Sequence, residues 1–218
     1  MLRTLEIDSE IAPRASVILL HGLGASGHDF SDIAEQLGLP KELGVRFVFP
    51  HAPVRPVKCF DNAKVRAWFD LVSLEYHAKE DEAGMRKSEE MIAKLIAQEL
   101  ERGIPSEKII LAGFSQGGAM ALQCGLRYPE KLAGILVLSA WLPLATTVIA
   151  ERSATNQQTP ILMLHGINDP VVPLKWATES CNFLKEIGYH AMISSYPMRH
   201  TVCPEEIAAI GVWLRELC

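Results

Sequence analysis

Short, continuous apolar runs alternate with longer amphipathic stretches along this chain, and few architectures accommodate that pattern. The runs are rich in β-branched residues, as in Val17-Ile-Leu-Leu20 and Ile135-Leu-Val-Leu138. Strands without a polar face are buried on both sides, which is typical of parallel sheets. Parallel strands joined by helices have those helices packed over the sheet. We therefore predict an α/β fold with a mostly parallel central sheet and helices on both faces.

The individual elements follow from the same pattern. Strands are predicted at Ser16–Leu20, Val45–Phe49, Lys108–Ala112, Gly134–Leu138, Ile161–Leu164 and Ala191–Tyr196, with an antiparallel edge strand at Leu2–Ile7. Helices are predicted at His28–Leu37, Gly84–Arg102, Gln116–Tyr128, Leu174–Ile187 and Pro204–Leu217. Two long stretches, Pro50–Ala83 and Pro143–Thr159, show no clear element. Long loops in compact domains are commonly functional, so we expect both to border the substrate site.

Length and composition narrow the class of protein. The chain has 218 residues, enough for one sizeable core, so we expect a single domain over residues 1–218. A net charge of −5 argues against nucleic acid as a partner, because phosphate backbones are bound by clustered Lys and Arg. No apolar run is long enough for a signal peptide or a stable membrane insertion, which predicts a cytoplasmic location.

Cysteine and histidine usage gives no sign of a disulfide framework or a metal site. The five cysteines are an odd number without paired spacing, which suits reduced thiols. His200 and Cys203 could supply two metal ligands, but no second Cys or His pair lies near them to complete four. We therefore expect no metal site.

Gly113-Phe-Ser-Gln-Gly117 matches the pattern G-x-S-x-G, whose glycines permit a tight turn that lifts a serine above the sheet. A chain of this length contains the pattern by chance with a probability of roughly 7%. An ordinary glycine turn after a strand is therefore the alternative. The context favours the nucleophile turn, because a buried strand precedes the motif and a helix that starts with small residues follows it. Ser115 is the predicted nucleophile of an α/β-hydrolase.

A serine hydroxyl needs a base to take its proton and a carboxylate to orient that base. In this fold the order along the chain is serine, acid, histidine. Asp169 follows a predicted strand, although Asn-Asp-Pro is also a common turn sequence. His200 precedes the last predicted helix. The alternative is that it is a surface histidine without a catalytic role. The other histidines, among them His165, His190 and His77, are less suitably placed, so we predict Asp169 and His200 as the acid and the base.

Acyl transfer also requires amides that stabilise the negative oxygen of the tetrahedral intermediate. In this fold they come from the residue after the serine and from a loop after an early strand. Gln116 supplies the first. The second is predicted at Leu23, within His21-Gly-Leu-Gly24, although that sequence could instead be only a tight exit from a strand.

Five segments together resemble the phospholipase/carboxylesterase family, which includes the acyl-protein thioesterases. They are His21-Gly-Leu-Gly-Ala-Ser-Gly-His-Asp-Phe30, Phe49-Pro-His-Ala-Pro53, Arg66-Ala-Trp-Phe-Asp70, Gly113-Phe-Ser-Gln-Gly-Gly118 and His165-Gly-Ile-Asn-Asp169. The resemblance covers nearly the whole chain and implies a single-domain α/β-hydrolase with catalytic Ser115, Asp169 and His200. It also implies oxyanion amides at Leu23 and Gln116, no cofactor, and a homodimer. Arg199 departs from the pattern, because bacterial members usually carry glycine before this histidine.

The leading hypothesis for the function is a serine carboxylesterase that acts on esters of short to medium acyl chains. The alternatives are an acyl-protein thioesterase or lysophospholipase as the physiological activity, and a non-catalytic binding protein that keeps the fold. The partner is accordingly a small-molecule ester or an acylated protein. Trp68, Trp141 and Leu142 are candidates to line the acyl pocket, although such residues are as often packed in the core.

Overall fold

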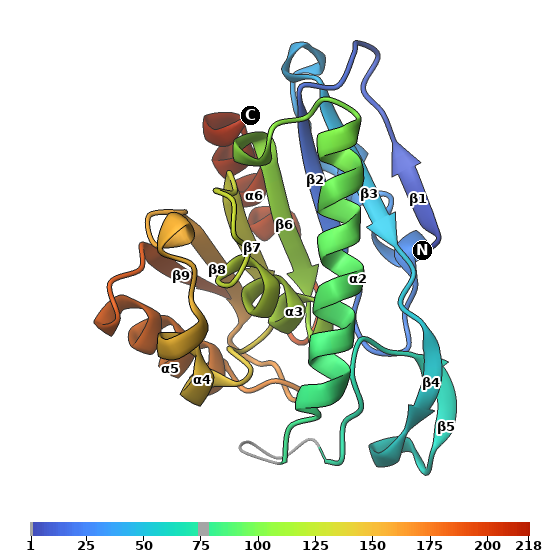
Figure 1. The fold of residues 1–218 in the computed structure, drawn as a ribbon, viewed down its shortest axis with the longest axis vertical. Helices are drawn as coiled ribbons and strands as arrows, with labels where there is room; N and C mark the ends of the chain where they lie inside the picture. The colour runs from blue at the N-terminus through green and yellow to red at the C-terminus, as the bar shows by residue number, and fades with distance from the viewer. Residues whose placement is uncertain (1, 74–78) are drawn as a thin grey trace.

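The computed structural model describes residues 2–73 and 79–218, and its main element is a seven-stranded sheet (Figure 1). The strand order is β1-β3-β2-β6-β7-β8-β9. The strands are β1 (Thr4–Ile7), β2 (Ala15–Leu20), β3 (Val45–Pro50), β6 (Ile109–Phe114), β7 (Gly134–Leu138), β8 (Ile161–Gly166) and β9 (Ala191–Tyr196). All pairings are parallel except that of β1 with β3 at the edge. The predicted α/β class and its antiparallel edge strand are confirmed.

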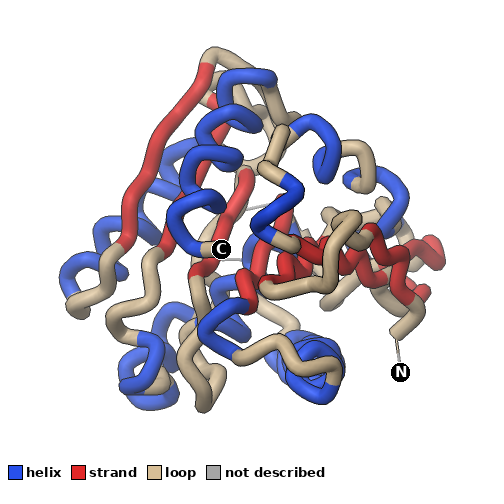
Figure 2. The backbone as a smooth tube through the Cα atoms, turned by 90° about the horizontal axis from the view of Figure 1, so that it is seen from above, coloured by secondary structure: helices blue, strands red, loops and turns tan. Residues whose placement is uncertain are grey.

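Helices cover both faces of this sheet, as the view from above shows (Figure 2). Along β2, Ile18 and Leu20 belong to one core, whereas Val17 and Leu19 belong to the other. The first core is closed by α2 (Glu82–Glu101), α3 (Gln116–Gly125), α4 (Ala145–Glu151) and α5 (Leu174–Glu186), and the second by α1 (Ile33–Gln36) and α6 (Pro204–Leu217). Within the described residues, no helix is both long enough and apolar enough to cross a membrane.

The predicted helix His28–Leu37 is wrong, because the chain forms two separate turns there. A 3₁₀ turn spans Gly27–Phe30 and is followed by the single α-helical turn of α1. Ser26 and Asp29 form a reciprocal cap, in which the Ser26 amide donates to Asp29 Oδ2 at 2.8 Å. This cap starts the first turn, whereas Asp32 makes no side-chain cap for α1. Local capping thus divides a stretch whose apolar spacing suggested one helix.

The two stretches in which no element was predicted contain short strands and a short helix. In the first, β4 (Val54–Val57) and β5 (Ala63–Arg66) form an antiparallel hairpin. Its turn holds Asp61 and Asn62 at φ 52° and 61°, a conformation that Asp and Asn tolerate better than other side chains. The second stretch contains α4. Residues 74–78 of the first stretch, including His77, lie outside the described residues.

Glu206, in the first turn of α6, gives the fold a pH-dependent stability. Its side chain is buried, and its two oxygens lack hydrogen-bond partners among the described residues. Burial raises its pKa from the usual value near 4.5 to about 8. The folded chain therefore binds more protons than the unfolded chain between these two pH values. Stability must fall as the pH rises through that range.

We expect Glu206→Gln to remove this loss, because a neutral amide has no charge to desolvate. The melting temperature at pH 8 should rise by roughly 5 °C over the wild type, with a much smaller gain at pH 5. Thermal unfolding at the two pH values measures the difference. The exposed neighbour supplies a control, Glu205→Gln, which should show no pH-dependent gain. Equal gains in both variants would contradict the assignment.

Candidate active site

Ser115 lies on the turn between β6 and α3, at the carboxyl end of the sheet (Figure 1). Its backbone has φ 54° and ψ −121°, which costs energy for a residue with a side chain. The turn closes because glycines flank it. A Cβ on Gly117 would lie 2.1 Å from the Leu20 carbonyl oxygen, and one on Gly113 would lie 2.2 Å from the Gly117 backbone. The two glycines therefore allow a close approach that places the serine above the sheet.

The structure brings Asp169 and His200 to this serine. His200 Nε2 lies 3.0 Å from Ser115 Oγ, and His200 Nδ1 lies 2.6 Å from Asp169 Oδ2. The carboxyl group of Asp169 is fully buried, and its Oδ1 accepts hydrogen bonds from the amides of Val171 and Val172 at 2.8 and 2.9 Å. A carboxylate on Nδ1 holds the proton on that nitrogen and leaves Nε2 free to accept from the serine.

Backbone packing places His200 beside the acid loop. The Asn168 amide donates to the Met198 carbonyl at 3.0 Å, so the loop after β8 is tied to the loop after β9. A Cβ on Gly166 would lie 2.4 Å from the Arg199 carbonyl oxygen, which explains the glycine at this crossing. The Arg199 side chain itself is exposed, and it does not line the cavity that adjoins Ser115 and His200.

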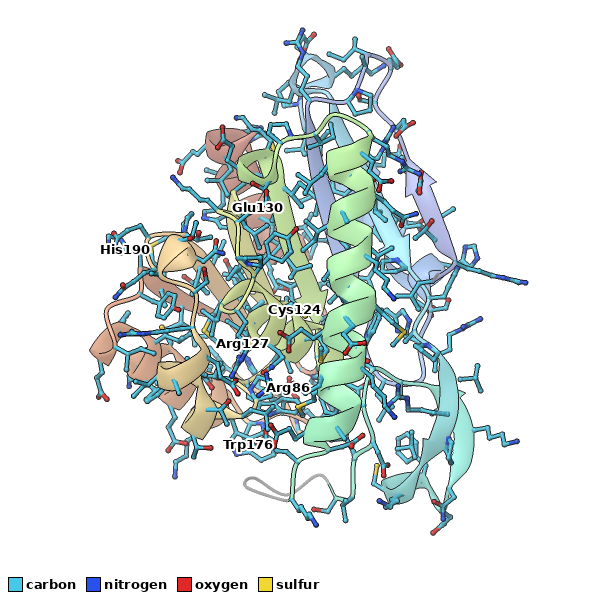
Figure 3. The ribbon with its side chains drawn as sticks, viewed as in Figure 1. Arg86, Cys124, Arg127, Glu130, Trp176 and His190 are labelled. Atoms are coloured by element: carbon cyan, nitrogen blue, oxygen red, sulfur yellow. The ribbon has the colours of Figure 1, made fainter. Side chains whose placement is uncertain are left out.

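Two other histidines that could have served as the base lie away from the serine. His165 is buried behind the acid, its Nε2 is 2.7 Å from the Val172 carbonyl oxygen, and burial lowers its pKa. It therefore supports the loop that carries Asp169. His190 is exposed and directly precedes β9, so it lies at the other end of that strand from His200, and Figure 3 shows it well apart from Trp176.

The candidate oxyanion amides belong to loops that flank the serine. Leu23 and Gln116 both line the same cavity as Ser115. Gln116 is the first residue of α3, so its amide has no acceptor within the helix. The Leu23 amide likewise donates to no acceptor among the described residues. Both groups are thus available to a bound oxygen atom.

His21 fixes the loop that carries Leu23. Its Nε2 accepts from the Ala52 amide at 3.0 Å, and its Nδ1 lies 2.7 Å from the Gly22 carbonyl oxygen. These two contacts require a neutral ring with the proton on Nδ1. Burial lowers the pKa of His21 to about 4, which keeps the ring neutral at physiological pH.

A cavity of about 490 Å³ opens beside the serine and the histidine. Its walls are mainly apolar and include Phe30, Phe60, Phe69, Leu71, Phe114, Trp141, Leu142, Val171 and Trp176. Pockets of this size and lining bind small apolar groups. Of the three predicted pocket residues, Trp141 and Leu142 line the cavity. Trp68 does not: its side chain is fully buried beneath the site, where it packs among other core residues.

Part of the cavity wall was not predicted. Val171 lies two residues after Asp169, so the position of the acid loop was a usable signal for it. Phe60 comes from the unpredicted hairpin. Trp176 lies on α5, where nothing distinguishes it from an ordinary helical residue. In the structure the Trp141 ring lies edge-on to Phe69 and to Trp176, with centroids 6.5 and 6.2 Å away, so these three aromatic rings form one continuous wall.

An ion-pair network holds α4 against this wall. Glu151, at the end of α4, accepts hydrogen bonds from Arg86 of α2 at 2.5 Å and from Arg127 at 2.7 Å. Figure 3 shows both arginines pointing into the region between α2, α3 and α4. The hydrogen bond from Arg86 has the largest effect, and together these bonds lower the pKa of Glu151 to about 2. The network fixes the helix that carries Ala145 into the cavity wall.

Comparisons with known proteins identify the family of this chain. A family model described as phospholipase/carboxylesterase matches residues 4–217. An acyl-protein thioesterase 1 from Neurospora crassa is 40% identical over 211 residues, covering 93% of this chain and 86% of the relative. The crystal structure of Arabidopsis thaliana SOBER1 superposes with a TM-score of 0.89 at 32% identity, over 93% of this chain and 98% of the other. Acyl-protein thioesterase 2 from Zea mays gives a TM-score of 0.88 at 32% identity, over 98% of both chains.

Proposed function

The chain belongs to the phospholipase/carboxylesterase family and is a serine hydrolase, and within that family we propose that it is an acyl-protein thioesterase. The observation that carries the proposal is the hydrogen-bonded series Ser115, His200 and Asp169, of which Ser115 and His200 line an apolar cavity. The names of the similar relatives favour the thioesterase over a general carboxylesterase of short to medium esters, which the sequence alone had favoured.

The proposed reaction has two halves. His200 Nε2 takes the proton from Ser115 Oγ as the oxygen attacks the thioester carbonyl carbon, and the negative oxygen that forms is stabilised by the amides of Leu23 and Gln116. The carbon–sulfur bond breaks, and the cysteine sulfur of the substrate leaves with the proton from His200. In the second half, His200 takes a proton from water, which attacks the acyl-enzyme. The fatty acid leaves and Ser115 recovers its proton.

A matched pair of peptides tests the substrate class. The two peptides share one sequence and one octanoyl group, which is attached through cysteine sulfur in the first and through serine oxygen in the second. We expect kcat/KM for the thioester to exceed that for the ester by about tenfold or more, and both activities to vanish in Ser115→Ala. Equal values, or a preference for the ester, would instead support the carboxylesterase. No activity on either peptide would contradict the hydrolase mechanism.

The cavity makes a separate prediction about acyl chain length. Ala145 lines the cavity, so Ala145→Phe should fill part of it and exclude the far end of a long chain. We expect kcat/KM for long acyl chains to fall by about tenfold, while that for an acetyl substrate changes little. Ile149→Phe is the matched control, because Ile149 lies one turn further along α4 and is 59% exposed. The same chain-length profile in both variants would show that the acyl group lies elsewhere.

A further inference from the structure

The segment from Arg66 to Phe69, which we call the bridging segment, runs between the two loops that carry the candidate oxyanion amides. One of these loops is held at two points. The Gly24 amide donates to the Arg66 carbonyl oxygen at 2.8 Å, and the Trp68 indole N–H donates to the His21 carbonyl oxygen at 2.8 Å. Leu23 lies between these two anchored residues. Its amide is therefore positioned from both sides by the bridging segment.

The other loop is held through a side chain. Gln116 Oε1 accepts from the Trp68 amide at 2.8 Å, and Gln116 Nε2 donates to the Phe69 carbonyl oxygen at 2.8 Å. The oxygen and the NH₂ group of this side chain are both engaged, which fixes its orientation. Gln116 is only 1% exposed, so water does not compete for these bonds. The residue that offers the second oxyanion amide is thus anchored to the same segment as the first loop.

These contacts join two loops that are more than 90 residues apart in the sequence, because both attach to Trp68 and its neighbours. The benefit of an oxyanion site depends on donors placed about 3 Å from where the charge develops. Small displacements of such groups lower the rate steeply while leaving ground-state binding largely intact. Catalysis therefore depends on the distance between the two amides. The bridging segment can fix this distance because it is hydrogen-bonded to both loops.

We propose that the bridging segment sets the spacing of the two oxyanion amides, with the side chains of Trp68 and Gln116 as its positioning residues. The proposal rests on the proposed function, since the amides act as oxyanion donors only in acyl transfer. It gives a structural role to residues of the sequence Arg66-Ala-Trp-Phe-Asp70, which the fold alone does not require. It also gives Trp68 a role beneath the site that differs from the predicted role in the pocket wall.

Two substitutions remove the side-chain links and leave in place the Gly24–Arg66 backbone bond and both oxyanion amides. Trp68→Phe keeps a buried aromatic ring but loses the bond to the His21 carbonyl, and Gln116→Met keeps the side-chain length but loses both of its bonds. We expect kcat to fall by about tenfold to a hundredfold in each, with KM within twofold of the wild type. The affinity for a trifluoromethyl ketone, whose adduct with Ser115 carries the oxyanion, should fall by the same factor as kcat.

Further readouts separate positioning from loss of structure. The pH profile of kcat should keep its shape, because the contacts of His200 are unchanged. The double variant should lose less than the product of the two single losses, because both act through one segment. Ser88→Ala is the matched control, since Ser88 Oγ bonds the Trp68 carbonyl from α2 and contacts neither oxyanion loop. It should lower the melting temperature and leave kcat within twofold.

These experiments distinguish a failure of the positioning role from a failure of the proposed function. If Trp68→Phe does not fold, site-specific incorporation of benzothienylalanine at position 68 removes the N–H with little change of shape. Unchanged kcat in these variants, beside an active wild type and an inactive Ser115→Ala, would overturn the positioning role alone. Equal losses of kcat in Ser88→Ala would overturn it as well. A wild type without hydrolase activity would overturn both this proposal and the proposed function.

Discussion

Replacing Ser115 with alanine is expected to lower kcat for acyl hydrolysis by on the order of a millionfold, the loss that removal of a serine nucleophile can cause. The hydroxyl is the atom that His200 Nε2 contacts at 3.0 Å, and the acyl-enzyme would form on it. Without it, His200 has no nucleophile to activate at this position. Hydrolysis of a chromogenic acyl ester, followed with purified wild type and variant, measures the effect over the required range.

A second serine provides the control for this experiment. Ser139 follows β7 with φ 49°, so it shares with Ser115 a strand-end position and a strained backbone. It is fully buried, and it does not line the cavity. Ser139→Ala should therefore keep its rate within a few fold. A Ser115→Ala variant that retains more than about one per cent of the wild-type rate would rule out the serine mechanism.

Sequence reasoning predicted the part of the site that local patterns encode. Ser115, Asp169 and His200 each follow a strand in the order that the fold requires, and the ends of parallel strands meet at one edge of the sheet. The prediction of these three residues rests on strand and turn signals close to each of them. The structure brings His200 within hydrogen-bond distance of both Ser115 and Asp169.

The parts that were missed depend on contacts between distant segments. Trp68 was expected in the pocket, but apolar character does not reveal whether a side chain faces a cavity or the core. Its position follows from bonds to His21 and Gln116, which are 47 and 48 residues away in the sequence. The helix predicted at His28–Leu37 failed for another reason, since periodicity outweighed the capping signal at Ser26.

The hairpin β4–β5 was also missed because it depends more on contacts between separated residues than on a local sequence pattern. Asp61-Asn62 is a turn signal, but two strands of four residues without regular alternation give almost no pattern. Asp70 anchors the hairpin, because its carboxylate accepts from the Lys58 amide at 2.8 Å and pairs with the Lys58 ammonium at 3.0 Å. Such a contact becomes visible only once the two ends of the segment are folded together.

Asp169→Asn is expected to lower kcat by about ten-thousandfold while the backbone of the site stays in place. In the wild type, Asp169 Oδ1 accepts from the amides of Val171 and Val172, and an asparagine oxygen can accept the same two bonds. That orientation turns the asparagine NH₂ toward His200 Nδ1, which must then become the acceptor. The ring proton moves to Nε2, where it blocks acceptance from Ser115.

The prediction is checked by kinetics together with NMR of the histidine ring nitrogens, which identifies the tautomer directly. The expected result is a folded variant with its His200 proton on Nε2 and a kcat reduced by about four orders of magnitude. Asp29→Asn serves as control, because Asp29 also accepts a backbone amide, that of Ser26, but contacts no member of the catalytic series. If Asp169→Asn kept the wild-type tautomer and rate, the carboxylate would only brace its loop, and another group would have to orient His200.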